Sequence, residues 1–224
     1  MASARDPDVR SPYNLPLSCG EICVYRQVPN IITVSRLALT IVFFFLLHVH
    51  EKDTFTRQMW IGFVVFVVAA LTDAIDGYLA RKWKVESVFG RIVDPFVDKI
   101  LIVGAFILFS SDEFVNVAAL KYFPDARNIT GVAPWMCVVL IAREFLITGI
   151  RGVAEAKGVD FSADWAGKVK MIVQSIAVGA IMVDLALTGQ NSFVRITRDI
   201  TIWTTVVVTA LSAITYIVRA RRLL

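Results

Sequence analysis

The sequence predicts an all-α integral membrane protein whose six transmembrane helices surround a polar cavity that faces the cytoplasm. Three observations lead to this fold class. Hydrophobic residues make up 57% of the 224 residues, whereas a soluble domain contains about 45–50% apolar residues. The excess falls into six blocks of about 20 residues, the length at which a helix crosses a bilayer. Several blocks also carry ionisable residues inside the ends that would face the cytoplasm, where such groups can line a cavity.

The elements follow in order along the chain. Residues 1–28 are polar, contain three prolines and lack the apolar core of a cleavable signal peptide, so we expect a cytoplasmic N-terminal segment. Within it, residues 20–28 fit a short amphipathic surface helix. Residues 29–222 form one membrane domain, whose expected helices are 31–50, 58–79, 92–112, 132–152, 168–189 and 197–218.

Lysines and arginines predict the orientation, because cytoplasmic segments carry an excess of both. With the N-terminus inside, the outer segments hold only six of the 23 basic residues: Lys52, Arg57, Lys121, Arg127, Arg195 and Arg198. Both termini are therefore expected to be cytoplasmic, in a multi-pass protein of the cell membrane. The net charge of +4 mostly reflects this asymmetry. It suits anionic lipid headgroups and phosphate substrates and does not indicate nucleic-acid binding.

The second and third expected helices are joined by the stretch LTDAIDGYLARKWKVESVFGRIVDPFVDKI, residues 71–100. Asp73 and Asp76 are three residues apart, and Asp94 and Asp98 are four apart. Each pair therefore lies on one face of its helix. Two adjacent antiparallel helices can then present four carboxylates to one another, below the cytoplasmic interface. Ionisable groups inside a membrane helix are costly enough to indicate a function.

Four carboxylates in this setting require compensating charge, and no set of four basic residues interleaves with them. Two divalent cations would match them. All-oxygen ligands suit Mg²⁺ or Mn²⁺ rather than zinc or copper. Two such ions a few ångströms apart form the usual clamp for displacement at phosphorus. We expect a shallow groove beside the metals, formed by Asp76, Gly77, Ala80 and Arg81, because small side chains let a ligand approach the backbone.

The full pattern resembles the signature of the CDP-alcohol phosphotransferase family, with eight fixed positions filled: Asp73-x2-Asp76-Gly77-x2-Ala80-Arg81-x8-Gly90-x3-Asp94-x3-Asp98. The resemblance implies a six-helix membrane enzyme, commonly a homodimer, that uses two divalent cations and cleaves a CDP-linked lipid or alcohol. It implies that Asp73, Asp76 and Asp94 are metal ligands. Asp98 would be both a metal ligand and the general base.

The same resemblance implies the nucleotide site and the substrates. Gly77, Ala80 and Arg81 would lie with Asp76 against the CMP part. Three further stretches are similar to bacterial phosphatidylglycerophosphate synthases: PNIITVSRL (29–37), IAREFLITGIRGVAEAKG (141–158) and WAGKVKMIVQ (165–174). This similarity implies transfer of a phosphatidyl group from CDP-diacylglycerol, held in the lipid bilayer, to glycerol 3-phosphate. The products would be phosphatidylglycerol phosphate and CMP.

Asn30 and Thr33 begin a polar stripe on one face of the first helix, continued by Arg36. The stripe either lines the nucleotide side of the site or is an interfacial helix end. Asp184 lies near the outer end of the fifth helix, where we expect an interfacial position.

Basic residues in the fourth and fifth helices fit the phosphate of the acceptor. Arg143 and Arg151 are eight residues apart, or about 12 Å along a helix. Both suit phosphate, which guanidinium groups bind in a bidentate manner. Glu144 is expected to point elsewhere, so it is only a candidate partner for Arg143. Lys168 and Lys170 point about 200° apart on a helix, so only one can face a common pocket. We favour Lys168, and the alternative is that both are positive-inside anchors.

Two other function classes stay open. A sister enzyme would use another acceptor, such as inositol phosphate or phosphatidylglycerol. A divalent-cation transporter would use the four carboxylates as its ion site. Transport needs a path open alternately to both faces, and the outer halves WIGFVVFVVAAL and LIVGAFILF offer no polar path. A structural membrane protein would not need the aspartate cluster.

Overall fold

The computed structural model describes residues 19–48, 54–83, 88–111, 114, 129–158, 165–188 and 190–223. Within these ranges, only the backbone is described for residues 19–33, 73–83, 88–98, 155, 166 and 222–223. The described part holds six α-helices: α1 (Cys19–His48), α2 (Phe55–Trp83), α3 (Val88–Phe109), α6 (Pro134–Ala156), α7 (Trp165–Ala186) and α8 (Ser192–Leu223). The predictions of an all-α fold and of six helices are confirmed for these residues.

Each helix overlaps one of the apolar blocks, and the boundaries differ most at the N-terminus. α1 begins at Cys19, well before the expected start at residue 31, and continues without a break to His48. Residues 20–28 are therefore helical and continuous with α1. Their amphipathic character and surface position stay a prediction, since their side chains lie outside the described set.

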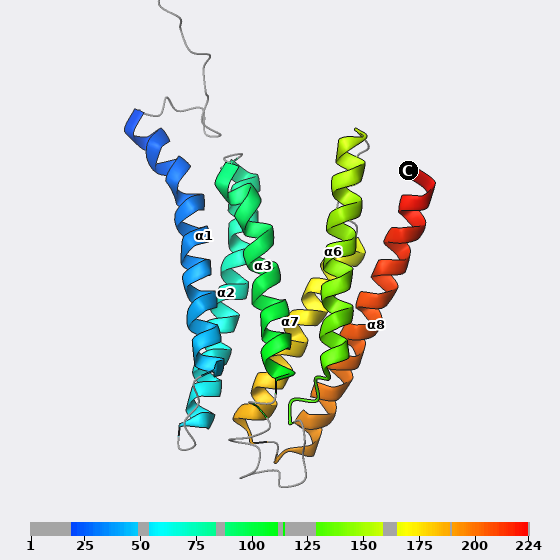
Figure 1. The fold of residues 1–224 in the computed structure, drawn as a ribbon. Coiled ribbons are helices and arrows are strands. Elements are labelled where there is room, and N and C mark those ends of the chain that lie inside the picture. The colour runs from blue at the N-terminus through cyan, green and yellow to red at the C-terminus, as the bar shows by residue number, and fades with distance from the viewer. Residues whose placement is uncertain are drawn as a thin grey trace, which may run out of the picture.

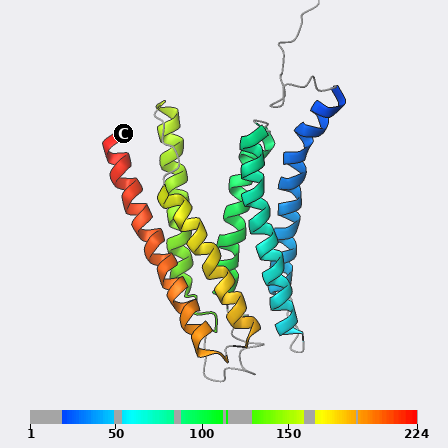
Figure 2. The same ribbon diagram turned by 180° about the vertical axis from the view of Figure 1, so that it is seen from behind.

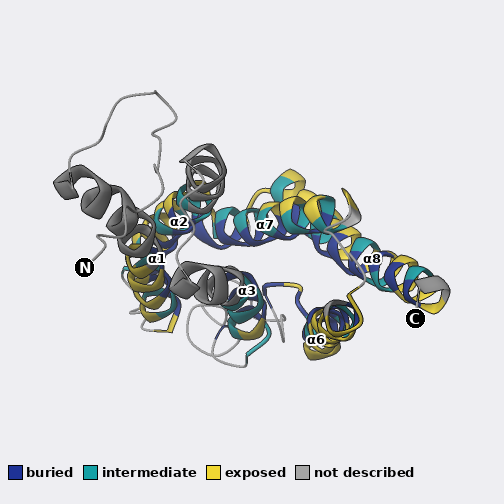
Figure 3. Cartoon of the chain, turned by 90° about the horizontal axis from the view of Figure 1, so that it is seen from above, coloured by how far each residue is buried: buried dark blue, intermediate teal, exposed yellow. Residues whose placement is uncertain are grey.

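Successive helices run in opposite directions, so the Cys19 end of α1 and the C-terminal end of α8 lie at the same end of the bundle (Figure 1). α7 is the central helix. It contacts α2 on one side and α8 on the other, and it crosses the bundle obliquely in the view from behind (Figure 2). α3 contacts α1, α6 and α7. Seen from above, α1 to α3 form one group and α6 and α8 another, with α7 between them (Figure 3).

Aromatic side chains fill the core between the helices. The rings of Phe43 and Phe66 lie 5.6 Å apart between α1 and α2, and Phe106 is buried beside them in the same cluster. A Cβ atom at Gly104 would overlap the ring of Phe44. The glycine therefore lets α3 approach α1 closely.

Outside this apolar core, the distribution of polar and apolar side chains differs from that in a soluble protein. Large apolar side chains are exposed on all six helices, among them Phe45, Val64, Ile107, Val138, Ile172 and Trp203. Charged and amide side chains are buried instead, namely Arg36, Arg143, Glu144, Lys170, Gln174, Asp184 and Arg198. Ionisable residues inside lipid face the bundle interior in this way.

Three helical segments of the described residues are long and apolar enough to cross a membrane: Phe55–Thr72, Gly167–Ala186 and Ser192–Arg221. Val34–His48 and Lys99–Phe109 are shorter apolar helices. α6 carries Arg143, Glu144 and Arg151 along its length and is not among the three. These apolar helices indicate a membrane protein, whereas the six spans stay a prediction.

The end of the bundle that holds the α7–α8 connection contains a buried ion pair. Arg198 Nη1 donates to Asp184 Oδ2 at 2.5 Å and to the backbone oxygen of Ile129 at 2.5 Å. Arg198 Nη2 also donates to Asp199 Oδ1 at 2.7 Å. Asp184 lies near the end of α7, as expected, and this pair buries its side chain inside the protein. Its position at the membrane interface stays a prediction. The contact joins α7, α8 and the segment before α6.

Candidate functional site

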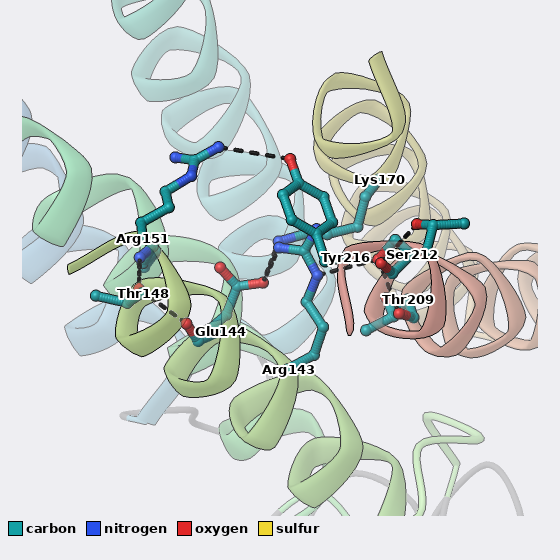
Figure 4. A network of polar contacts seen from close by, with 10 residues as sticks. Arg143, Glu144, Thr148, Arg151, Lys170, Thr209, Ser212 and Tyr216 are labelled. Carbon is teal, nitrogen blue, oxygen red and sulfur yellow. Dashed lines mark hydrogen bonds and ion pairs between the residues drawn. The ribbon is translucent and has the colours of Figure 1, made fainter. Parts of the chain in front are cut away.

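Glu144 of α6 is a shared hydrogen-bond acceptor for two basic side chains (Figure 4). Its Oε1 accepts a hydrogen bond from Arg143 Nη1 at 3.1 Å and a short one from Lys170 Nζ of α7. All three residues are buried. The expectation that Glu144 points away from Arg143 is therefore wrong. Adjacent residues leave a helix in different directions, but the long arginine side chain reaches its neighbour's carboxylate.

α8 holds the other side of the Arg143 guanidinium. Arg143 Nε donates to Ser212 Oγ at 3.0 Å. Its Cζ atom lies 5.6 Å from the centroid of the Tyr216 ring, within the range of a cation–π interaction. Ser212 and Tyr216 are four residues apart and so share one face of α8. Arg143 Nη2, which carries two N–H groups, is buried without a hydrogen-bond partner among the described residues.

Arg151 lies two turns further along α6 and reaches the same tyrosine. Its Nη2 donates a long hydrogen bond of 3.5 Å to the Tyr216 hydroxyl oxygen. Its Nε is buried and has no hydrogen-bond partner within the described part of the chain. Tyr216 thus contacts both arginines, one through its ring and the other through its hydroxyl group.

α3 contributes a further cation. Lys99 Nζ donates to Thr148 Oγ1 at 2.8 Å, and Thr148 Oγ1 donates to the backbone oxygen of Glu144 at 2.8 Å. Lys99 directly follows Asp98 in α3. The backbone turn that carries Asp98 therefore runs beside this network.

These residues surround a cavity of about 180 Å³ between α3, α6, α7 and α8. We call it the basic cavity, after its polar lining of Lys99, Arg143, Glu144, Thr148, Arg151, Lys168, Lys170, Gln174 and Tyr216. Five of these side chains are basic and only one is a carboxylate. Such a cavity attracts anions, and its guanidinium groups suit phosphate in particular.

Comparison with known proteins decides the family. A sequence profile described as CDP-alcohol phosphatidyltransferase matches residues 26–211. The chain belongs to the CDP-alcohol phosphatidyltransferase family. The resemblance inferred from the aspartate signature is confirmed.

Relatives within the CDP-alcohol phosphatidyltransferase family align over most of their length. The chain is 31% identical over 199 residues to the CDP-diacylglycerol–glycerol-3-phosphate 3-phosphatidyltransferase of Bacillus subtilis, covering 85% of this chain and 93% of that protein. It is 30% identical over 197 residues to a probable phosphatidylglycerophosphate synthase of Mycobacterium tuberculosis, covering 88% and 82%. A relative from Rickettsia typhi with the same name as the first is 27% identical over 191 residues, covering 85% and 95%.

The structure brings the four predicted acceptor-site residues of this family member to one cavity. Arg143, Arg151, Lys168 and Lys170 all line the basic cavity. The expectation that only one of Lys168 and Lys170 can face a common pocket is wrong, because both line the cavity. Lys170 is buried against Glu144 while Lys168 is exposed, and which of them binds the acceptor stays a prediction. The buried side chain of Gln174, one turn after Lys170, lies on the same inner face of α7. Binding of phosphate by these residues stays a prediction.

The other predicted site residues have side chains outside the described set: Asn30, Thr33, Asp73, Asp76, Gly77, Ala80, Arg81, Asp94 and Asp98. Their backbone is helical, in α1, α2 and α3. The helical spacing that places each aspartate pair on one face therefore holds for the backbone. The meeting of the four carboxylates stays a prediction.

Sequence reasoning missed Lys99, Ser212 and Tyr216. The position of Lys99 directly after the last signature aspartate was a signal for it, although adjacent residues leave a helix in different directions. Ser212 and Tyr216 left no comparable signal. Their contacts with α6 span 69 and 65 residues of sequence, and only the packing of α8 against α6 reveals them.

Proposed function

We propose that the protein transfers the phosphatidyl group of CDP-diacylglycerol to glycerol 3-phosphate, giving phosphatidylglycerol phosphate and CMP. The observation that carries the proposal is the basic cavity, which places five cationic side chains beside the helix that bears Asp98. The relatives named above carry the names of enzymes of this reaction, and they align with most of this chain.

Four aspartates would hold two divalent cations, Mg²⁺ or Mn²⁺: Asp73, Asp76, Asp94 and Asp98. The residues fit these metals, since the donors are all carboxylate oxygens and the backbone of both pairs is helical. When bound, the ions would neutralise the pyrophosphate oxygens and stabilise charge on the departing CMP.

The nucleotide would lie along α1 and the end of α2. The small side chains of Gly77 and Ala80 leave room for a ligand next to the backbone. The residues proposed to contact the CDP part are Asn30, Thr33, Asp76, Gly77, Ala80 and Arg81.

The reaction requires a base and an oriented acceptor. Asp98 would accept the proton from the primary hydroxyl of glycerol 3-phosphate. That oxygen forms a bond to the phosphorus attached to diacylglycerol, and the bond from this phosphorus to the CMP oxygen breaks. CMP leaves with the electron pair. Arg143, Arg151 and Lys170 would hold the acceptor's phosphate through charge-assisted hydrogen bonds, with Lys168 at the rim, and so orient the attacking hydroxyl.

The membrane arrangement supports access for both substrates. We infer six spans, with residues 29–222 as the membrane domain, residues 1–28 in the cytoplasm and both chain ends on the cytoplasmic side. The exposed apolar side chains on every helix support this arrangement. The lipid substrate would keep its tails in the bilayer, and glycerol 3-phosphate would enter the basic cavity from the cytosol. A homodimer would match the family resemblance.

An acceptor panel tests the function. CMP release from labelled CDP-diacylglycerol would be measured with Mg²⁺ or Mn²⁺ and with glycerol 3-phosphate, inositol phosphate, phosphatidylglycerol, serine or no acceptor. We expect rapid release with glycerol 3-phosphate alone and loss of release on chelation. Serine has no phosphate to pair the buried cations, which costs about 1–3 kcal/mol for each unpaired group. Turnover with inositol phosphate or phosphatidylglycerol alone would contradict the acceptor, and no release with any acceptor would favour cation transport.

A further inference from the structure

The face of α8 that carries Ser212 and Tyr216 contacts both arginines of the basic cavity. We propose that Tyr216, together with Ser212, positions Arg143 and Arg151 so that one free donor of each serves the acceptor's phosphate. Tyr216 is then a positioning residue that sets the preference for a phosphate monoester. This inference rests on the proposed function, because it assigns the phosphate of glycerol 3-phosphate to this cavity.

Ser212 fixes one edge of the Arg143 guanidinium. Its Oγ donates its own proton to the backbone oxygen of Thr209 at 2.8 Å. A hydroxyl has a single proton to donate, so toward Arg143 Nε, at 3.0 Å, the oxygen can only accept. Because a guanidinium group has donors and no acceptor, Arg143 Nε must donate here, and the contact with the α8 backbone turns the hydroxyl so that its oxygen can accept.

Tyr216 brings the two arginines together. Their backbone positions are eight residues apart, about 12 Å along α6, and two guanidinium groups in one cavity repel each other. The tyrosine offers an electron-rich ring face to Arg143 and a hydroxyl oxygen to Arg151. Only 2% of its surface is exposed, and a Cβ atom at Gly167 of α7 would lie 3.6 Å from its hydroxyl oxygen. The side chain is therefore enclosed on the α7 side as well.

The donors that remain indicate the ligand. Arg143 Nη2 and Arg151 Nε are buried and, among the residues that the structure describes, have no hydrogen-bond partner. A buried donor without a partner is costly, and both arginines line the basic cavity, so the cavity suits a ligand that accepts hydrogen bonds. A dianionic phosphate monoester supplies several oxygen atoms and the opposite charge.

The experiment compares the whole protein, in lipid nanodiscs with Mg²⁺, with three variants and one control. Tyr216→Phe removes only the hydroxyl contact, and we expect the KM for glycerol 3-phosphate to rise about three- to tenfold, the effect of one lost hydrogen bond. Tyr216→Leu also removes the ring, and the rise should exceed tenfold, since a desolvated cation–π contact adds up to about 2 kcal/mol. Ser212→Ala should raise the same KM about three- to tenfold.

In all three variants, kcat and the KM for CDP-diacylglycerol should change less than about twofold, because uniform loss of acceptor binding leaves the chemical step unchanged. Inorganic phosphate should compete with glycerol 3-phosphate in the wild type and bind more weakly to Tyr216→Leu. Ile217→Ala, on an exposed position of α8, is the control and should match the wild type. A purely structural role of Tyr216 would instead lower kcat and thermal stability and raise both KM values together.

The outcomes separate this inference from the proposed function. Absence of wild-type CMP release with glycerol 3-phosphate would contradict the function itself. With wild-type turnover established, an unchanged KM for glycerol 3-phosphate in Tyr216→Phe and Ser212→Ala overturns the inference and leaves the reaction intact. A parallel rise of the KM values for glycerol 3-phosphate and CDP-diacylglycerol also overturns the inference and leaves the reaction intact. Tyr216→Phe keeps the ring and the packing, so the test stands even where Tyr216→Leu fails to fold.

Discussion

Individual side chains of the basic cavity show how charge is balanced inside the bundle. Glu144 is the acceptor for both Arg143 and Lys170. Among the described side chains, one carboxylate is therefore shared by two cations. Complete pairing would stabilise the empty protein but would leave nothing for a ligand. Within the described part of the chain, an excess of buried cations over carboxylates suits the binding of a phosphate.

Arg143→Ala and Arg151→Ala should each raise the KM for glycerol 3-phosphate about tenfold or more, because a hydrogen bond to a charged group contributes about 1.5–3 kcal/mol. The KM for CDP-diacylglycerol should change much less. Steady-state CMP release measures both constants. Lys157→Ala removes an exposed basic residue just after α6 and serves as the matched control. Equal loss of affinity for both substrates would point to misfolding or to a different pocket.

Asp98→Asn should abolish turnover while binding of CDP-diacylglycerol largely survives. The amide keeps the shape of the side chain but cannot accept the proton, and three other carboxylates can still hold metal. A general base contributes about 10²-fold or more. Single-turnover kinetics, with binding of the lipid substrate measured in parallel, check this result. A variant that retains more than about a tenth of the wild-type rate would exclude Asp98 as the base.

At the scale of the helices, the sequence predicts where each element lies better than which way it faces. The apolar blocks located all six helices, because the length of an apolar run and the charges that flank it are local properties. The inner face of α7 was not found, since Lys168 and Lys170 are both basic and only the packing against α6 selects Lys170. The early start of α1 at Cys19 was also missed, because polar residues continue that helix beyond its apolar part.

The Asp184–Arg198 pair should stabilise the packing of α7 on α8. Asp184→Ala leaves Arg198 buried without its partner on α7, which costs about 3–5 kcal/mol. Thermal unfolding in detergent should shift to lower temperature, while both KM values stay unchanged, since Asp184 lies 14 residues beyond Lys170, about 21 Å along the helix. Asp199→Asn changes a carboxylate that is 49% exposed and should cost at most about 1 kcal/mol. Equal stability of Asp184→Ala and wild type would show that the pair is dispensable.

At the scale of the whole molecule, the described helices expose apolar side chains and bury a few ionisable groups within a mainly apolar core. The basic cavity is lined by residues of α3, α6, α7 and α8. The acceptor side of the site could be predicted in part, because Arg143, Arg151 and Lys170 stand out as charges in apolar helices. The contribution of Ser212 and Tyr216 to this site could not be predicted, because polar residues in the last helix do not indicate which residues they contact.

The orientation of the bundle can be measured with single cysteines. In a background without Cys19, Cys23 and Cys137, Ser192→Cys marks the α7–α8 connection and Arg221→Cys marks the end of α8, both at exposed positions. The excess of basic residues predicts that the α8 end is cytoplasmic. A membrane-impermeant maleimide should label Ser192→Cys in right-side-out vesicles and Arg221→Cys only after permeabilisation. The opposite labelling pattern would reverse the orientation and place the basic cavity on the outer side.

The long sequence separation between Arg143 and its α8 contacts has a consequence for biogenesis. In the six-span arrangement, Arg143 leaves the ribosome 69 residues before Ser212, an interval of roughly 3–14 s at about 5–20 residues per second. An arginine at the centre of an inserting helix costs about 2.5–3.5 kcal/mol on the translocon scale. During that interval Arg143 can pair only with Glu144 of its own helix, and later α7 adds the contact of Lys170 with Glu144. These contacts would keep α6 in the bilayer until α8 arrives. A chain terminated before α8 would therefore be a target for membrane quality-control proteases rather than a partly active enzyme.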